Sequence, residues 1–330
     1  MSRFKVALVG MDADERPAWV GETLAKAEIE LVQYECKTRE DLERYAANAD
    51  LVWVYSGDRI LHGNLDVLQR CGAIIRTGSG TDNVPVSDAT ERGIVVANTP
   101  EAISETVAEH AIALWLSVIR QIPIQDRAVR RGVWDRDLAM PRYHIKSHTL
   151  GVIGFGHIAR AVVRKVRGFE LRVLVADPFV DESIMKELGA EKADLDTVLS
   201  EAEFVTVHTP LMESTHHLIG AREFGLMKPT AVFINTSRGP VVDEAALYEA
   251  LTSGQIAAAG LDVTEKEPPD TDNSLLQLPN VVVTPHIAPY SDIYQDEMWR
   301  LSVDTVLDFA GGRWPRSYVN RDVKPKWALK

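Results

Sequence analysis

The chain of 330 residues is long enough for two domains, and its 45% hydrophobic and 25% charged residues are typical of globular proteins. Its net charge of −12 argues against nucleic acid or an anionic membrane as the main partner. With only Cys36 and Cys71, no long apolar segment and no signal-peptide pattern, it is expected to work in the cytoplasm without disulfides or a bound metal.

Short β-branched runs alternate with helix-like segments along the chain, which is typical of parallel α/β proteins. The first series of predicted strands, within the first hundred residues, contains FKVALVG, IELVQYE, DLVWVYS, AIIRTG and GIVVANT. The second series contains LGVIGFG, LRVLVADP, FVTVHTP, AVFINTS, AAAGLDV and VVVTPH. Because the runs are continuously apolar, we expect strands that are buried on both faces of doubly wound parallel sheets.

A long helix is predicted between the two series, with Thr99 as its N-cap and Pro100 as its first residue. His110 on this helix is expected to satisfy an interface hydrogen bond. A further helix is predicted at about 292–309, before two glycines. The apolar residues of the long helix recur at the spacing of one buried stripe, at Val107, Ala111, Leu114, Trp115 and Val118.

A nucleotide-binding fingerprint opens the second series, where GVIGFGHIARAV carries Gly154-x-Gly156-x-x-Ala159 between a strand and a helix. Glycines allow a tight turn and close backbone approach, and a helix N-terminus offers amide groups to a pyrophosphate. Asp177 ends the next strand, 21 residues beyond Gly156, where an acidic group accepts hydrogen bonds from an adenine ribose. No arginine follows it, so the sequence predicts NAD rather than NADP.

Three polar residues follow strands of the second series: Arg238, Glu267 and His286. Alone, they would be a surface ion-pair partner, a solvated loop residue and a structural histidine. Because the carboxyl ends of parallel strands share one edge, we expect them on the same edge as the glycine loop. A guanidinium grips a carboxylate through two hydrogen bonds, and a carboxylate-paired imidazole donates protons near neutral pH. Reduction of a 2-keto acid requires these groups.

The motifs GVIGFGHIA, NTSRGPVVDEAAL, GLDVTEKEP and TPHIA occur in the order and at the intervals of one family. With RTGSGTDNV and TVAEHAIAL upstream, the chain resembles the D-isomer-specific 2-hydroxyacid dehydrogenases from about residue 74 to 289. The resemblance implies two Rossmann-like domains. A flavodoxin-like substrate domain would comprise residues 1–99 and 290–330, and an NAD-binding Rossmann domain residues 100–289.

The resemblance also implies residue roles. Arg238 would bind the substrate carboxylate and carbonyl, His286 would be the acid/base, and Glu267 would pair with it. The backbone of Ser79 and Gly80 would hold the substrate carboxylate as well. The long helix from Pro100 resembles the family's dimer-forming helix, so a homodimer is expected. The implied cofactor contacts are Gly154, Gly156, His157, Ile158, Asp177, Thr209, Pro210, Thr215, Thr236, Ser237, Arg238, Asp262 and His286, with Asp262 on the nicotinamide carboxamide and Thr106 as a weaker candidate.

The resulting hypothesis is an NAD-dependent enzyme that interconverts a D-2-hydroxy acid and its 2-keto acid, such as glyoxylate or hydroxypyruvate. Phosphoglycerate dehydrogenase remains an alternative, disfavoured by the end of the chain at Lys330 without a regulatory domain. A further alternative is an NAD(H)-sensing, corepressor-like binding protein on the same fold. Arg76 and the basic segment 120–146, with seven Lys/Arg against three Asp, are candidates for a second anionic group. Pro289 departs from the family pattern and leaves the substrate open.

Overall fold

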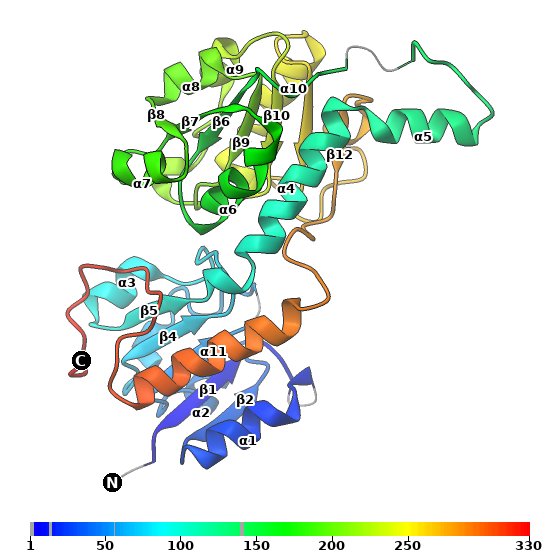
Figure 1. Cartoon of the computed structure of the whole chain (residues 1–330). Coiled ribbons are helices and arrows are strands. Elements are labelled where there is room, and N and C mark those ends of the chain that lie inside the picture. Colours follow the sequence, from blue (N-terminus) through cyan, green and yellow to red (C-terminus); the bar gives the residue numbers. More distant parts are fainter. Residues whose placement is uncertain (1–2, 13–14, 56, 139–141) are drawn as a thin grey trace. The chain divides into compact units, whose positions relative to one another are not determined.

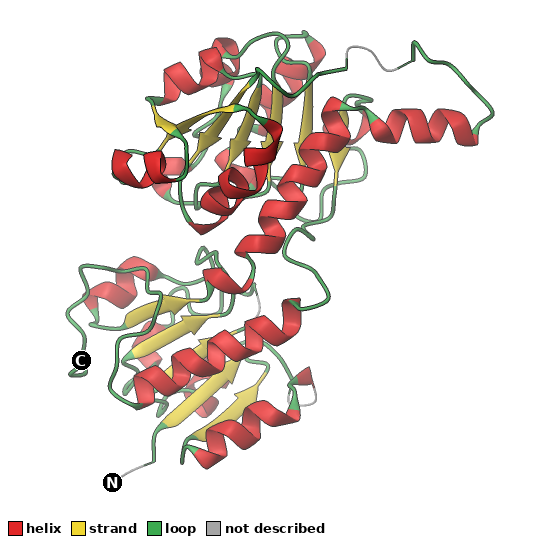
Figure 2. Ribbon diagram, in the orientation of Figure 1, coloured by secondary structure: helices red, strands yellow, loops and turns green. Residues whose placement is uncertain are grey.

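A computed structural model describes residues 3–12, 15–55, 57–138 and 142–330, which form two compact units. Unit 1 comprises Met1–Ile103 and Ser291–Lys330, and unit 2 comprises Ser104–Tyr290. Both units are α/β, with parallel strands and helices on both sheet faces (Figures 1 and 2). Among the described residues, no helix is both long and apolar enough to cross a bilayer.

The sheet of unit 1 has the order β2-β1-β3-β4-β5, which is the flavodoxin-like order. Helices α2 and α3 pack on one face of this sheet, and helices α1 and α11 pack on the other. The strands are β1 (Lys5–Val9), β2 (Glu30–Tyr34), β3 (Leu51–Val54), β4 (Ala73–Arg76) and β5 (Val95–Asn98). The helices are α1 (Ala18–Lys26), α2 (Arg39–Tyr45), α3 (Val86–Glu91) and α11 (Tyr294–Ala310), with 3-10 turns η2 (Leu65–Val67) and η3 (Pro100–Ala102).

The sheet of unit 2 has the order β12-β11-β10-β9-β6-β7-β8, so the strand order reverses between β6 and β9. Ligands of doubly wound sheets bind at such a reversal, beyond the carboxyl ends of the strands. The strands are β6 (Thr149–Ile153), β7 (Arg172–Ala176), β8 (Glu191–Lys192), β9 (Phe204–Val207), β10 (Val232–Asn235), β11 (Ala258–Leu261) and β12 (Val281–Val283).

The helices of unit 2 cover both faces of its sheet. Each face has its own apolar cluster, which the helices on that face help to form. Helices α4 and α6 pack on one face, while α8, α9 and α10 pack on the other. The helices are α4 (Ser104–Ile119), α5 (Ile122–Arg130), α6 (His157–Val166), α7 (Glu182–Glu187), α8 (Leu195–Glu201), α9 (Ala221–Leu226) and α10 (Glu244–Thr252), with 3-10 turns η4 (Arg167–Phe169), η5 (Glu213–Thr215), η6 (Gly239–Val241) and η7 (Ser274–Gln277).

The long helix begins later than its sequence indicates. Pro100 opens the 3-10 turn η3, and α4 starts at Ser104. Thr99 does not cap this helix, since its hydroxyl instead accepts the Gly78 amide at 2.7 Å. The predicted apolar stripe is buried, with Leu114 and Trp115 each 3% exposed. The N-cap prediction was therefore wrong because a neighbouring loop uses the Thr99 hydroxyl, whereas the buried stripe is confirmed.

Candidate functional site

The glycine loop after β6 meets the steric demands of a bound pyrophosphate. Gly154 has φ 84°, and a Cβ there would lie 2.9 Å from the carbonyl oxygen of His208. Gly156 faces open space, and it starts α6 without a side-chain cap. The first amide groups of α6, at His157 and Ile158, therefore have no capping side chain in front of them. Free amide groups at a helix N-terminus bind anions.

Asp177 follows β7 directly and is fixed against the glycine loop. Its Oδ2 accepts the amide hydrogen of Phe155, and its Oδ1 accepts that of Phe179, both at 2.8 Å. Each carboxylate oxygen has a second acceptor position, so the pair can also receive the two hydroxyl groups of a ribose. The following acidic residues, Asp181 and Glu182, would repel a 2′-phosphate at this position.

Two threonine hydroxyl groups at neighbouring strand ends are buried and have no hydrogen-bond partner among the described residues. In the described part of the chain, Thr209 Oγ1 after β9 and Thr236 Oγ1 after β10 make no hydrogen bond. Buried polar atoms are nearly always paired, so these hydroxyl groups are open to a bound cofactor. Thr215 differs, because its hydroxyl closes the preceding loop by donating to the Pro210 carbonyl at 2.6 Å. Ser237 is held in the same way by Asn235, whose Oδ1 accepts the serine amide and hydroxyl at 2.9 and 2.7 Å.

Arg238 lies in a turn that depends on a glycine. A Cβ at Gly239 would lie 1.9 Å from the carbonyl oxygen of Thr264, so the loop after β10 packs directly on the loop after β11. The Asn235 side chain donates to the Arg238 carbonyl at 3.0 Å, and the guanidinium donates to the Ser237 carbonyl at 2.8 Å. These contacts fix the arginine at the carboxyl end of β10.

His286 and Glu267 form a pair at the same edge of the sheet. His286 Nδ1 lies 2.7 Å from Glu267 Oε2, and Glu267 Oε1 accepts the Thr264 amide at 3.2 Å. A carboxylate only accepts, so Nδ1 carries a hydrogen and Nε2 is left for another partner. The imidazole is 41% exposed, which leaves it accessible. His286 has φ 51°, a conformation that costs a non-glycine residue about 1–3 kcal/mol.

Asp262 directly follows β11 and is 1% exposed. Burial opposes its ionisation, but the nearby His110 imidazole and hydrogen bonds from Thr284 and two backbone amides outweigh burial, so the pKa of Asp262 lies below its usual value. His110 and Thr284 are the functional candidates that sequence reasoning missed. The His110 Nε2 lies 2.9 Å from Thr284 Oγ1 within unit 2, and the interface hydrogen bond expected for His110 stays a prediction. No spacing rule links residues so far apart, so the sequence contained no signal for this contact.

In unit 1, the loop after β4 carries Ser79 and Gly80. Gly78 has φ 105° and donates its amide hydrogen to Thr99, while the Asn98 side chain donates to the Ser79 carbonyl at 2.8 Å. Within the described part of unit 1, no acceptor receives the Ser79 or Gly80 amide, so both are available to an anion. Arg76 donates to the carbonyl of Thr77 and thus contacts its own loop.

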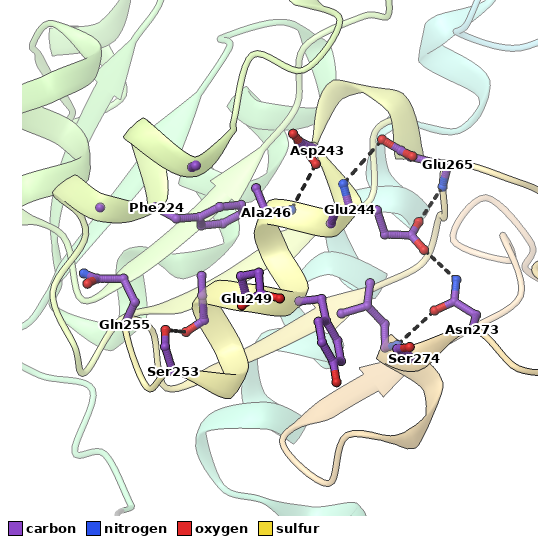
Figure 3. Close-up of a pocket in the computed structure, with 16 residues that line it drawn as sticks. Phe224, Asp243, Glu244, Ala246, Glu249, Ser253, Gln255, Glu265, Asn273 and Ser274 are labelled. Carbon is purple, nitrogen blue, oxygen red and sulfur yellow. Dashed lines mark hydrogen bonds between the residues drawn. The ribbon is translucent and has the colours of Figure 1, made fainter.

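A cavity of about 870 Å³ lies elsewhere in unit 2, at α9, α10 and η7 (Figure 3). Two of its carboxylates are engaged locally, since Asp243 caps α10 and Glu244 accepts hydrogen bonds from the Glu265 amide and the Asn273 side chain (Figure 3). Its lining has four acidic residues and no basic one, which does not suit an anionic substrate. The strand-end loops, rather than this cavity, are the candidate active site.

Comparison with known proteins agrees with this geometry. The family model for the D-isomer specific 2-hydroxyacid dehydrogenase, NAD binding domain, matches residues 112–288. A glyoxylate reductase of Korarchaeum cryptofilum is 43% identical over 74% of this chain and 74% of its own. A D-3-phosphoglycerate dehydrogenase of Archaeoglobus fulgidus is 39% identical over 88% of this chain, which spans only 55% of that relative. The solved glyoxylate reductase of Paecilomyes thermophila has a TM-score of 0.85 at 28% identity, covering 96% of this chain and 98% of its own.

The chain belongs to the D-isomer-specific 2-hydroxyacid dehydrogenase family. The predicted family, the α/β fold with a Rossmann NAD-binding domain and the assignment as an NAD-dependent oxidoreductase are thereby confirmed. The glycine cradle, the uncapped start of α6 and the unpaired threonine hydroxyls fit NAD. Small 2-keto and 2-hydroxy acids are the class of substrate that fits this family.

Proposed function

We propose that this dehydrogenase reduces glyoxylate or a similarly small 2-keto acid to the D-2-hydroxy acid, and catalyses the reverse reaction. The observation that carries the proposal is the 2.7 Å contact between His286 and Glu267 on the sheet edge where Arg238 is fixed. This set supplies a proton donor, a group that holds it in one tautomer, and a cation for the substrate carboxylate. The glyoxylate reductases among the relatives support a small substrate.

The proposed chemistry divides between these side chains. Arg238 binds the substrate carboxylate through paired hydrogen bonds and polarises the neighbouring carbonyl. His286 donates a proton from Nε2 to the carbonyl oxygen, and Glu267 stabilises the imidazolium through Nδ1. The backbone amides of Ser79 and Gly80 are proposed as further donors to the carboxylate. NAD supplies hydride acceptance and donation, and it would be held by Gly154, Gly156, His157, Ile158, Asp177, Thr209, Pro210, Thr215, Thr236, Ser237 and Asp262.

The experiment that tests this proposal measures oxidation of NADH and of NADPH with a panel of 2-keto acids. The panel contains glyoxylate, hydroxypyruvate, pyruvate and phosphohydroxypyruvate. We expect turnover with NADH and glyoxylate, and a much lower kcat/KM with NADPH because of Asp177. A preference for phosphohydroxypyruvate would instead favour the phosphoglycerate dehydrogenase alternative, which the Archaeoglobus relative supports. NADH binding without turnover of any acid would favour the corepressor-like alternative.

We also infer a homodimer. The apolar stripe of α4 is buried within unit 2, so we infer that the partner surface extends from this helix onto the segment that follows it. Helix α5 projects away from the sheet (Figure 1), and Ile122 and Val129 on it are each 52% exposed. Trp134 beyond it is 80% exposed. Clustered exposed apolar side chains mark interaction surfaces. The inference is tested by measuring the oligomeric state of Trp134→Ser and of the unchanged chain by light scattering. A cytoplasmic location stays a prediction.

A further inference from the structure

The backbone around His286 is held by a single buried residue of the neighbouring strand end. The His286 amide donates to the carbonyl oxygen of Asp262 at 2.8 Å. The next two amides, of Ile287 and Ala288, donate to Asp262 Oδ1 at 3.0 Å and Oδ2 at 2.9 Å. Three consecutive amide groups thus bind one aspartate. A left-handed non-glycine residue persists only where its surroundings impose the conformation, and Asp262 is the residue that does so here.

The orientation of Asp262 itself depends on Thr284. The threonine hydroxyl donates to Asp262 Oδ1 at 2.6 Å. This bond and the amide bond from Ile287 meet on the same oxygen, so loss of the hydroxyl removes a side-chain bond that orients the carboxylate and weakens its hold on the loop. Because a hydroxyl has one hydrogen, Thr284 can only accept from its other neighbour.

That neighbour is His110 of α4, whose Nε2 lies 2.9 Å from Thr284 Oγ1 and 3.4 Å from Asp262 Oδ1. The Thr284 hydroxyl hydrogen is already donated to the carboxylate, so His110 Nε2 must carry a hydrogen. The hydrogen bonds then run in one direction, from His110 to Thr284 and from Thr284 to Asp262. The imidazole is 21% exposed and the Asp262 side chain is fully buried, so water competes little for these bonds.

We propose that His110, Thr284 and Asp262, here called the Asp262 clamp, form a positioning network that aims the His286 imidazole for proton transfer. The clamp contacts the backbone of residues 286–288, whereas Glu267 contacts the ring, so the two control different degrees of freedom of one side chain. His110 and Thr284 are positioning residues, since each acts through Asp262. The inference rests on the proposed role of His286 as the proton donor.

The kinetic test compares Thr284→Val with Thr284→Ser, because valine preserves the shape and serine preserves the hydroxyl. With NADH and glyoxylate, we expect Thr284→Val to lower kcat about 10- to 100-fold, since catalysis falls steeply with misplacement of a reacting group. The Kd for NADH should rise much less than kcat falls, because the glycine loop and Asp177, the proposed contacts of the pyrophosphate and the ribose, lie outside the clamp. Thr284→Ser should restore most of kcat.

A matched control is Thr305→Val in α11 of unit 1, where a buried threonine hydroxyl donates to a backbone carbonyl at 2.8 Å. This variant loses a comparable hydrogen bond outside the clamp and should keep its kcat. Equal kcat for Thr284→Val and Thr284→Ser, whether both high or both low, would overturn the proposal. Should Thr284→Val not fold, His110→Leu and His110→Gln form a second pair, in which only glutamine retains a donor and is expected to keep activity.

A measurement without substrate separates failure of the clamp from failure of the proposed function. Hydrogen exchange of a peptide covering residues 284–290 reports the Ile287 and Ala288 amides, whose bonds to Asp262 slow exchange. We expect faster exchange in Thr284→Val than in Thr284→Ser, and no change in Thr305→Val. Equal exchange in both Thr284 variants would refute the clamp. If the unchanged chain reduces no keto acid, the proposed function fails, while the exchange difference still decides whether the clamp holds the loop.

Discussion

The glycine loop and the loops that carry Arg238, Glu267 and His286 lie at the carboxyl ends of strands in one sheet, but their contacts reach over different distances along the chain. Asp177 binds the amide of Phe155, only 22 residues away, within a single βαβ unit. His286 depends on Asp262 and through it on His110, which is 174 residues from Thr284. The contacts of Asp177, the proposed ribose acceptor, are thus local in sequence, whereas those of His286, the proposed proton donor, involve residues from distant parts of unit 2. Substitutions in the two regions should therefore affect different kinetic constants.

The largest effect is expected for His286→Ala. It removes the proposed proton donor, and we expect kcat for glyoxylate reduction to fall about 100- to 10,000-fold. The Kd for NADH, measured by fluorescence titration, should change little because the glycine loop is intact. His144→Ala, which removes an exposed histidine, is the control. A kcat within a few-fold of the unchanged chain would exclude His286 as the donor.

Arg238→Lys should have the next largest effect. Lysine keeps the charge but cannot form two parallel hydrogen bonds to a carboxylate, and it loses the contact to the Ser237 carbonyl. We expect kcat/KM for glyoxylate to fall about 100-fold, which corresponds to roughly 2.7 kcal/mol. Steady-state kinetics at saturating NADH provide the measurement, with the exposed Arg313→Lys as control. Unchanged kcat/KM would mean that another group binds the carboxylate.

Asp177→Ala tests the other side of this comparison, the proposed cofactor site. The substitution removes the proposed ribose acceptor and the partner of the Phe155 amide. We expect the Kd for NADH to rise about tenfold, the effect of one strong hydrogen bond, with a smaller effect on kcat at saturating NADH. Asp181→Ala, four residues further on, should leave the Kd nearly unchanged. Equal effects of both substitutions would point to general charge rather than to ribose recognition.

The smallest expected effect is on the pH dependence of the free energy of unfolding. Desolvation lowers the pKa of His208, whose carbonyl borders Gly154, from the usual 6.5 to about 4. As the pH falls from 7 to 5, the unfolded chain takes up a proton at this residue and the folded chain does not. The free energy of unfolding therefore decreases by up to about 2 kcal/mol. Urea denaturation at both pH values should show a smaller loss for His208→Gln than for the unchanged chain or for His144→Gln. The same loss in all three would contradict this role for His208.

The sequence predicted the α/β class, the family and the cofactor because each has a local signature. Continuous apolar runs revealed the strands, and the spacing of Gly154, Gly156 and Asp177 indicated a nucleotide site. Sequence reasoning failed where distant residues decide the outcome. Thr99 has the chemistry of an N-cap, yet the Gly78 loop uses its hydroxyl. The left-handed turn at His286 and its link to His110 were equally invisible, because both depend on packing between α4 and the ends of β11 and β12.

The central claim is that His286 and Glu267 act as one unit, and a double-mutant cycle tests it most directly. Single-turnover rates of NADH oxidation with glyoxylate are measured for His286→Asn, Glu267→Gln and the double variant. If Glu267 works only through the histidine, the double variant should be no slower than His286→Asn alone. Losses that multiply in the double variant would show that the two side chains act independently, which would contradict the proposed mechanism.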